Sequence, residues 1–242
     1  MLMAKNQQPD ESSTNKTKTQ NRKTKTQPLT VRTPASRRLC PVHVNRISIS
    51  KLRILFIDVV GYSKLLADEQ SETLQLLNQI VRGTADFRSA EEKRELIRLP
   101  TGDGMALVFL TKPEAPVRCA LEISKAIKRY PELQLRMGIH SGSVNQVSDV
   151  NDRLNVTGAG INMAQRAMDC GDAGHILLSQ RVAGDLAQYR LWRPRLHDFG
   201  ECEVKHGVRV QIFILYTDEI GNRNVPSKLK PIPQEPAPSV IS

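Results

Sequence analysis

The chain has 242 residues, of which 39% are hydrophobic, enough for one domain with a real core plus some unstructured chain. The formal net charge is +10, but residues 1–51 carry 11 lysines and arginines against 2 acids, whereas the other 191 residues carry 24 against 23. The charge therefore gives no reason to treat the folded part as a nucleic-acid binder. The four cysteines form no Cys-x-x-Cys pair, so we expect reduced thiols rather than a disulfide framework or a zinc site.

Residues 1–48 are rich in Lys, Thr, Gln, Asn and Ser and contain few large apolar side chains. Such a segment cannot bury enough surface to offset its ordering entropy, so we expect a disordered basic tail. Its charge could bring it to nucleic acid or to an anionic membrane, and a solvated linker is the plainer alternative. Because the start of the chain has no apolar signal segment and no run of about 18 apolar residues occurs, a cytoplasmic location is expected.

Residues 49–217 alternate between strand and helix patterns. The apolar run at 51–60 predicts a buried strand, and the apolar spacing over 63–87 predicts a helix. Two apolar runs at 94–100 and 105–110 flank Thr-Gly-Asp-Gly, which is a strong signal for a β-hairpin.

The second half of this region continues the alternation. Thr111 has Glu114 three residues on, the pattern of a capping box, which predicts that a helix starts there. Further elements are predicted as a strand at 133–144, a helix at 158–170, a strand at 175–180, a short helix near 180–187, and strands at 189–200 and 209–216. Residues 218–242 are Pro-rich and are expected to form a second disordered tail.

The order of these elements is β-α-β-β-α-β, followed by a helix and strands. This order predicts the α+β class, as a ferredoxin-like βαββαβ sandwich with a C-terminal αβ extension. We expect helices on one face of the sheet, with the other face free for a site or a dimer contact.

Two aspartates stand at positions that suit metal binding. Asp58 ends the first predicted strand, before a glycine turn and a helix start, where a carboxylate can hold a divalent cation and free N–H groups can hold phosphate oxygens. Asp103 lies in the hairpin turn, and pairing of the hairpin beside the first strand would bring the two carboxylates together. Such carboxylates repel each other, and Mg²⁺ or Mn²⁺ between them removes that cost. The plainer alternatives are a helix cap for Asp58 and a simple turn residue for Asp103.

Asn162 and Arg166 are four residues apart in the helix predicted at 158–170, so they project from one face. Ile161 and Met168 lie on another stripe and suit packing. A guanidinium matches the charge that builds on a phosphoryl group, and a neighbouring asparagine can orient a sugar. The alternative is an ordinary exposed pair on an amphipathic helix.

Four motifs, at 54–66, 101–109, 135–144 and 158–168, resemble the class III nucleotidyl cyclase catalytic domain in their order and spacing. The resemblance covers roughly residues 51–217. Diguanylate cyclases share the core fold, but their Gly-Gly-(Asp/Glu)-Glu-Phe signature is absent from this sequence.

The resemblance implies a head-to-tail homodimer with its active sites at the interface. One subunit would supply the ligands of two Mg²⁺ or Mn²⁺ ions, namely Asp58, Asp103 and the backbone carbonyl of Val59. The turn formed by Val60, Gly61, Tyr62 and Ser63 would hold the β- and γ-phosphates. The partner subunit would supply Asn162 and Arg166, and Lys205 matches the region of a triphosphate-binding lysine.

The implied reaction is attack of the ribose 3′-hydroxyl on the α-phosphorus of a nucleoside triphosphate, with release of pyrophosphate. The chain would then be a phosphorus–oxygen lyase of intracellular signalling. Two metal ions would lower the pKa of the hydroxyl and hold the triphosphate, and Arg166 would stabilise the five-coordinate phosphorus.

The sequence departs from the family at the positions that read the base. Leu99, four residues before Asp103, replaces the lysine or glutamate of the family, and Asn155 stands seven residues before Asn162. Leucine forms no hydrogen bond and asparagine both donates and accepts, so weak base selection is expected. Pro100 removes a ladder donor and predicts a sheet edge or a distortion.

The leading hypothesis is an active homodimeric cyclase, with ATP expected ahead of GTP on base rate alone. One alternative is a catalytically weak cyclase-homology domain that serves as a nucleotide-binding sensor or a dimerisation module. A more distant one is a nucleic-acid-associated protein that works through the basic tail.

Overall fold

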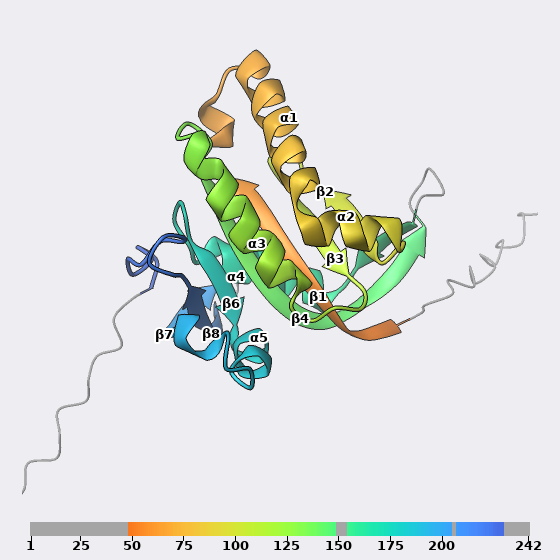
Figure 1. The fold of residues 1–242 in the computed structure, drawn as a ribbon, viewed down its shortest axis with the longest axis vertical. Helices are drawn as coiled ribbons and strands as arrows, with labels where there is room; N and C mark the ends of the chain where they lie inside the picture. Colours follow the sequence, from red (N-terminus) through yellow and green to blue (C-terminus); the bar gives the residue numbers. More distant parts are fainter. Residues whose placement is uncertain (1–47, 149–153, 205–206, 230–242) are drawn as a thin grey trace, which may run out of the picture. The chain divides into compact units, whose positions relative to one another are not determined.

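The structure is a computed structural model that describes residues 48–148, 154–204 and 207–229. The predicted tail at 1–48 lies outside the described residues except for its last position. Within the described residues, eight strands form one sheet and five α-helices pack on it (Figure 1). No helix among them is both long and apolar enough to cross a bilayer.

The strands are β1 (Ser48–Val59), β2 (Leu96–Pro100), β3 (Gly104–Phe109), β4 (Leu135–Ser148), β5 (Leu154–Thr157), β6 (Ile176–Ser179), β7 (Leu196–Val204) and β8 (Val208–Leu215). The helices are α1 (Ala67–Gly83), α2 (Ala85–Glu92), α3 (Ala115–Ala126), α4 (Ala159–Asp169) and α5 (Gln180–Leu186), with short 3-10 helices η1 (Tyr62–Lys64), η2 (Ile127–Arg129) and η3 (Arg193–Arg195).

The sheet order is β2-β3-β1-β4-β6-β8-β7, and β5 pairs with β4. The predicted α+β class and the βαββαβ order with an extension are confirmed. The central strand β1 pairs antiparallel with both β3 and β4. β2 lies at the edge of the sheet, where Pro100 loses no ladder partner, as its lack of an N–H predicts.

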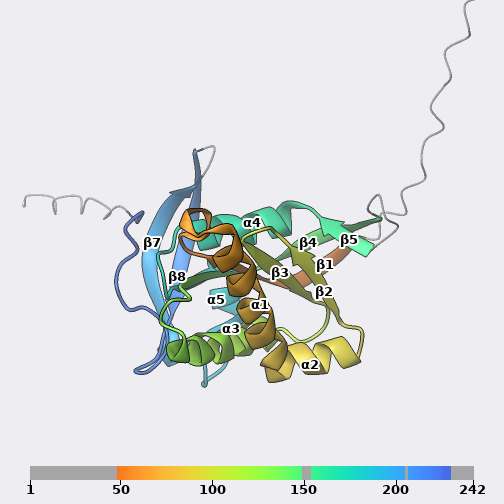
Figure 2. The same ribbon diagram turned by 90° about the horizontal axis from the view of Figure 1, so that it is seen from above.

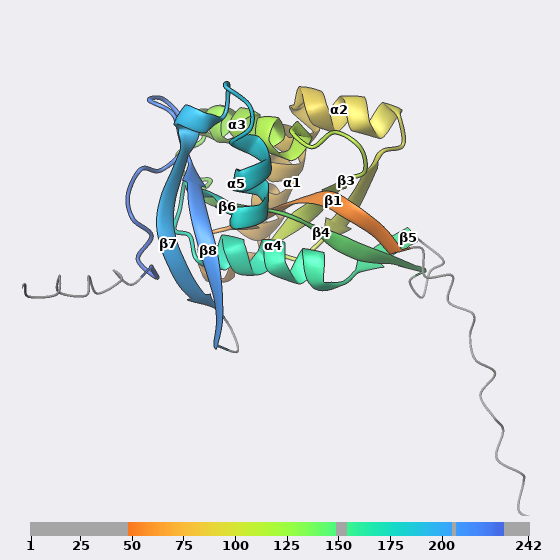
Figure 3. The same cartoon turned by 90° about the horizontal axis from the view of Figure 1, so that it is seen from below.

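Helices cover both faces of the sheet. α1, α2 and α3 lie on one face, over a core that includes Leu55, Ile57 and Leu107, and α4 lies on the other (Figures 2 and 3). The second face packs Ile54, Phe56 and other residues of alternate parity against α4. The expectation of one free sheet face is therefore wrong in part, because α4 covers some of it.

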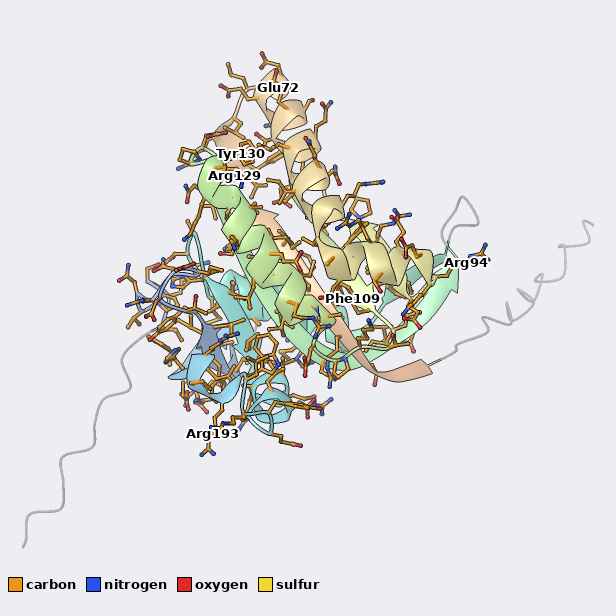
Figure 4. The ribbon with its side chains drawn as sticks, in the orientation of Figure 1. Glu72, Arg94, Phe109, Arg129, Tyr130 and Arg193 are labelled. Carbon is orange, nitrogen blue, oxygen red and sulfur yellow. A yellow bond between two sulfur atoms is a disulfide. The ribbon has the colours of Figure 1, made fainter. Side chains whose placement is uncertain are left out.

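Figure 4 shows the same layering in single side chains. Phe109 lies between the sheet and the helices, whereas Glu72 and Arg193 lie at the periphery of the domain. Phe109 is 2% exposed, since alternate residues of β3 point to opposite faces of the sheet and Phe109 points to the face with the larger core.

Two predicted helices start or break elsewhere. The helix expected over 63–87 divides at Thr84, whose backbone is extended (φ −71°, ψ 145°). The buried hydroxyl of Thr84 donates to the carbonyl of Val81 and contacts the sulfur of Cys119 in α3. The helix expected from Thr111 begins at Ala115. The Thr111 hydroxyl donates to Glu95 instead of capping, and Glu114 pairs with Arg118.

The C-terminal boundary also differs from the prediction. Residues 218–229 pack on the domain: Leu229 is 5% exposed, and Ser227 donates twice to Asp172. The expected tail at 218–242 is therefore wrong over 218–229, and 230–242 lie outside the described residues. The packing follows from three apolar side chains, Ile220, Pro226 and Leu229, and from several hydrogen bonds that the proline content concealed.

The cysteines differ from expectation as well. Cys170 and Cys202 form a disulfide, and Cys119 is free and buried. The expected reduced state is therefore wrong for this pair, because the chain brings together two cysteines 32 residues apart, a separation that no spacing motif marks.

Candidate functional site

The hairpin of β2 and β3 brings Asp103 to the end of β1, where Asp58 lies. Asp58 pairs with Gly104 across the β1–β3 ladder, and the backbone N–H of Val59 donates to the carbonyl of Asp103 (3.0 Å). The approach is close: a Cβ on Gly104 would lie 2.0 Å from the carbonyl oxygen of Ile57. Glycine at position 104 therefore allows the turn to lie against β1. The hairpin pairs beside the first strand, as the prediction about Asp58 and Asp103 requires.

The two carboxylates differ in their surroundings. Asp58 is 5% exposed, whereas Asp103 is exposed. Burial, the largest effect, raises the pKa of Asp58, and the neighbouring Asp103 raises it further. The site therefore favours either a proton or a cation beside Asp58.

An arginine that the sequence reasoning missed supplies that cation. Arg136 of β4 lies opposite Asp58 in the β1–β4 ladder, and its Nε donates to Oδ2 of Asp58 (2.8 Å). Its other end lies 3.5 Å from Oδ1 of Asp169, the last residue of α4. This ion pair lowers the pKa of Asp58, against the effect of burial. The one signal in the sequence was that Arg136 is a charged residue inside an apolar strand. Its partner, Asp58, could not be named, because the contact depends on how distant strands pair.

These groups line one cavity of about 410 Å³. Its walls are formed by Phe56, Asp58, Thr101, Asp103, Arg136, Ile161, Gln165, Met168 and Asp169. The charged part holds three carboxylates against one guanidinium and so suits a cation, while the apolar part suits a flat apolar group. The volume is typical of small-molecule sites.

Asn162 and Arg166 do not line this cavity. Ile161, Gln165 and Met168 face it from α4, while Arg166 lines a second cavity of about 350 Å³ with Cys170, Cys202 and Lys228. The predicted separation of the two stripes on this helix is confirmed. Within one chain, the structure does not bring Arg166 to Asp58.

The turn after β1 has the backbone of an anion cradle. The Val60 N–H donates to the carbonyl of Gln134 (2.8 Å), and Gly61 has a φ of 80°, which favours glycine. The 3-10 helix η1 (Tyr62–Lys64) follows directly. As at any helix start, its first N–H groups have no acceptor within the helix.

Of the three residues expected near the base and the triphosphate, the structure describes the side chain of Leu99 only. Leu99 is half-buried and packs against the second core, on the α4 side of the sheet. Asn155 is described by its backbone alone, opposite Val147, and Lys205 lies outside the described residues.

The carboxylate pair of Asp58 and Asp103 supplies part of a metal-ion site. The described residues contain no group of three or more His, Cys, Asp or Glu side chains that could hold one. Asp58 and Asp103 supply two hard oxygen donors, and the raised pKa of Asp58 and its contact with Arg136 show that positive charge is favourable there. These donors fit a hard divalent cation whose remaining ligands are backbone, water and phosphate oxygens.

Comparison with known proteins shows the family and the fold. Residues 44–217 match the adenylate and guanylate cyclase catalytic domain. The adenylyl cyclase CyaB from P. aeruginosa is 21% identical, with a TM-score of 0.56, over 69% of this chain and 94% of that one.

Two guanylyl cyclase domains from fungi have the same fold. The guanylate cyclase domain of RhGC from Catenaria anguillulae, solved in complex with GTP, is 19% identical (TM-score 0.55; 70% of this chain, 98% of that one). A dimeric guanylyl cyclase domain of the RhoGC fusion protein from Blastocladiella emersonii is 18% identical (TM-score 0.51; 69% and 97%). No curated protein sequence matches the chain.

Proposed function

Because the chain belongs to the adenylate and guanylate cyclase catalytic domain family, we propose that it converts a nucleoside triphosphate to a 3′,5′-cyclic nucleotide and pyrophosphate. The observation that supports this most is the meeting of Asp58 and Asp103 beside the Arg136 guanidinium in one cavity. A buried carboxylate such as Asp58, with a second carboxylate next to it, is costly unless positive charge lies beside it.

Asp58, Asp103 and the carbonyl of Val59 would hold Mg²⁺ or Mn²⁺. When bound, the ions supply Lewis acidity toward the ribose hydroxyl and the triphosphate. The turn from Val60 to Ser63 would orient the β- and γ-phosphates through the N–H groups that follow Val60, because the Val60 N–H itself donates to Gln134.

Arg136 has a part that the sequence reasoning did not assign. Arg136 contacts Asp58 at 2.8 Å and would be released from that carboxylate if Asp58 held a divalent cation. The released guanidinium lies in the same cavity and can donate to a phosphate oxygen, for which its planar fork is suited.

The proposed reaction needs Asn162 and Arg166 at the cavity of Asp58, and a single chain does not place them there. Arg166 opens onto a different cavity from Asp58, so its action on the α-phosphate requires a second copy, in which α4 of one subunit faces the carboxylates of the other. We propose a head-to-tail homodimer with two shared sites, and Asn162 would then orient the ribose.

The base is the least determined part of the substrate. Leu99 provides an apolar wall and no hydrogen bond, so it favours neither adenine nor guanine strongly. ATP is proposed ahead of GTP, with weak discrimination. A polar residue at 99 should sharpen the choice, and Leu99→Glu is expected to move the ATP/GTP ratio of kcat/KM toward GTP.

The direct test is turnover of ATP and of GTP by the full chain with Mn²⁺ and with Mg²⁺, measured as cyclic nucleotide and pyrophosphate. Asp58→Ala and Arg166→Ala should each be inactive. A mixture of the two should regain up to about a quarter of the activity, because one mixed dimer retains one intact site. No recovery in the mixture, with both variants folded and dimeric, would argue against the shared site.

The sensor hypothesis predicts a different result. Neither triphosphate would then give product, yet ATP or GTP with Mn²⁺ would raise the Tm, and Asp58→Ala would abolish that rise. Turnover that depends on both Asp58 and Arg166 would refute it.

A further inference from the structure

A disulfide joins the end of α4 to β7. Cys170 follows the last residue of α4, and its Cα lies 6.5 Å from that of Cys202 in β7. Both residues are buried, at 1% and 2% exposed. The bond therefore ties the C-terminal end of α4 to a strand at the far edge of the sheet.

The bond lies directly beside Arg166. The sulfur of Cys170 is 3.4 Å from the carbonyl oxygen of Arg166, one helical turn earlier. Both cysteines and Arg166 line the same cavity of about 350 Å³, so this cavity is the side from which a small thiol would approach the bond.

The two ends of α4 are held differently. Its middle packs closely on β4, where a Cβ on Gly138 would lie 2.5 Å from the carbonyl of Ala164. Directly after Arg166, Ala167 and Met168 are still buried in the core. The last residue of the helix and Cys170 after it are held by the disulfide, by a hydrogen bond from the Lys228 ammonium to the carbonyl of Asp169 (2.8 Å), and by the Arg136–Asp169 contact at 3.5 Å. The covalent bond is the strongest of these ties, since the other two are partly exposed and polar.

We propose that the Cys170–Cys202 disulfide is a redox-controlled tie that sets the position of Arg166, so that the oxidised protein is the catalytically competent form. This inference rests on the proposed function, in which Arg166 acts on the substrate held by the partner subunit. A guanidinium that must meet a phosphoryl group loses much of its effect when it is displaced by about 1 Å.

The chemistry balances with a low-molecular-weight thiol and its disulfide. In the reducing direction, a thiolate attacks one sulfur of the bond, forms a mixed disulfide and releases the other cysteine as a thiolate. A second thiol then attacks the mixed disulfide, so that two thiols become one small disulfide and the protein gains two thiols. Oxidation is the reverse exchange with the small disulfide.

The test uses the full chain in oxidised form and after reduction with dithiothreitol. Peptide mapping without reduction should show the Cys170–Cys202 pair. On reduction we expect hydrogen exchange of residues 159–170 to speed up, the Tm to fall by about 10 °C, and kcat with Mn²⁺ to fall about tenfold. The double variant Cys170→Ser/Cys202→Ser should resemble the reduced protein whether or not dithiothreitol is present.

Cys119→Ala is the matched control, because Cys119 is the free cysteine of the described residues and is buried in α3. It should keep the full response to dithiothreitol. If the oxidised and reduced proteins turn over equally, or if reduction leaves hydrogen exchange of 159–170 unchanged, the inference is wrong. If no form turns over, the proposed function fails, and the hydrogen-exchange result alone still decides whether the bond holds α4.

Discussion

Arg136→Gln removes the guanidinium charge from the candidate metal site and leaves a shorter, neutral polar side chain. Asp58, 5% exposed, then loses the guanidinium that now donates to it at 2.8 Å. Removal of one partner of a fully buried pair costs roughly 3–5 kcal/mol. Because the Arg136 side chain is 23% exposed and Asp58 can take up a proton, we expect the free energy of unfolding at pH 7 to fall by about 1–3 kcal/mol.

The pH dependence has a definite sign. In the folded protein the pKa of Asp58 lies above its ordinary value of 3.8, so the folded state binds more protons, and stability is lost as pH rises through the folded pKa. Arg136 lowers that pKa, and its loss therefore extends the window to higher pH. The difference between the variant and the unchanged protein should be small near pH 4 and grow toward pH 7.

Metal binding responds in the opposite direction. Mn²⁺ no longer competes with a guanidinium for Asp58, so the variant should bind it about tenfold more tightly. Calorimetric titration with Mn²⁺ and urea unfolding between pH 4 and pH 8 measure the two effects. Arg209→Gln is the control, because Arg209 is 68% exposed and lies 3.8 Å from Glu201; it should change stability by less than about 0.5 kcal/mol. Mn²⁺ affinity that is unchanged or weaker in Arg136→Gln would refute the reasoning.

Two further predictions concern the frame around the site. Gly138→Ala should destabilise the protein by about 3 kcal/mol, because the added Cβ would meet the backbone of Ala164 and Met168 at 2.5 Å. Gly184→Ala in α5 should instead stabilise it by about 0.5–1 kcal/mol, because no atom lies within 4 Å of the added Cβ. Equal Tm values for the two variants would contradict this. Burial, Arg181 and Arg53 lower the pKa of His140 from 6.5 to about 4, so stability is lost as pH falls below 6.5, by about 1–2 kcal/mol between pH 7 and pH 5. His140→Gln should flatten that part of the urea-derived profile, and an unchanged slope would show that another group is responsible.

The sequence by itself determined the elements whose signals are local. The apolar run before Asp58, the Asp-Gly turn at 103 and the amphipathic pattern around Arg166 each lie within one short window, and each element appears in the structure. The order of these elements predicted the fold class, and the four motifs predicted the family. Local periodicity and turn chemistry are properties of neighbouring residues, so one sequence is enough to read them.

Some local signals were nevertheless overridden by packing. The helix pattern over 63–87 continues through Thr84, but the buried hydroxyl of that residue bonds back to Val81 and the chain turns there. The proline-rich end predicted a tail from 218, yet Leu229 packs into the domain. In both places buried contacts with distant residues outweighed the propensity of the segment, because propensities amount to fractions of a kcal/mol per residue.

The tertiary structure alone decided the chemistry around the site. Arg136 meets Asp58 across 78 residues of sequence, Cys170 meets Cys202 across 32, and Arg166 opens away from the carboxylates of its own chain. Each of these facts depends on which strands pair, in which register, and on which residues that pairing removes from water. Strand register and burial arise from contacts between distant segments, and no local window of the sequence contains them.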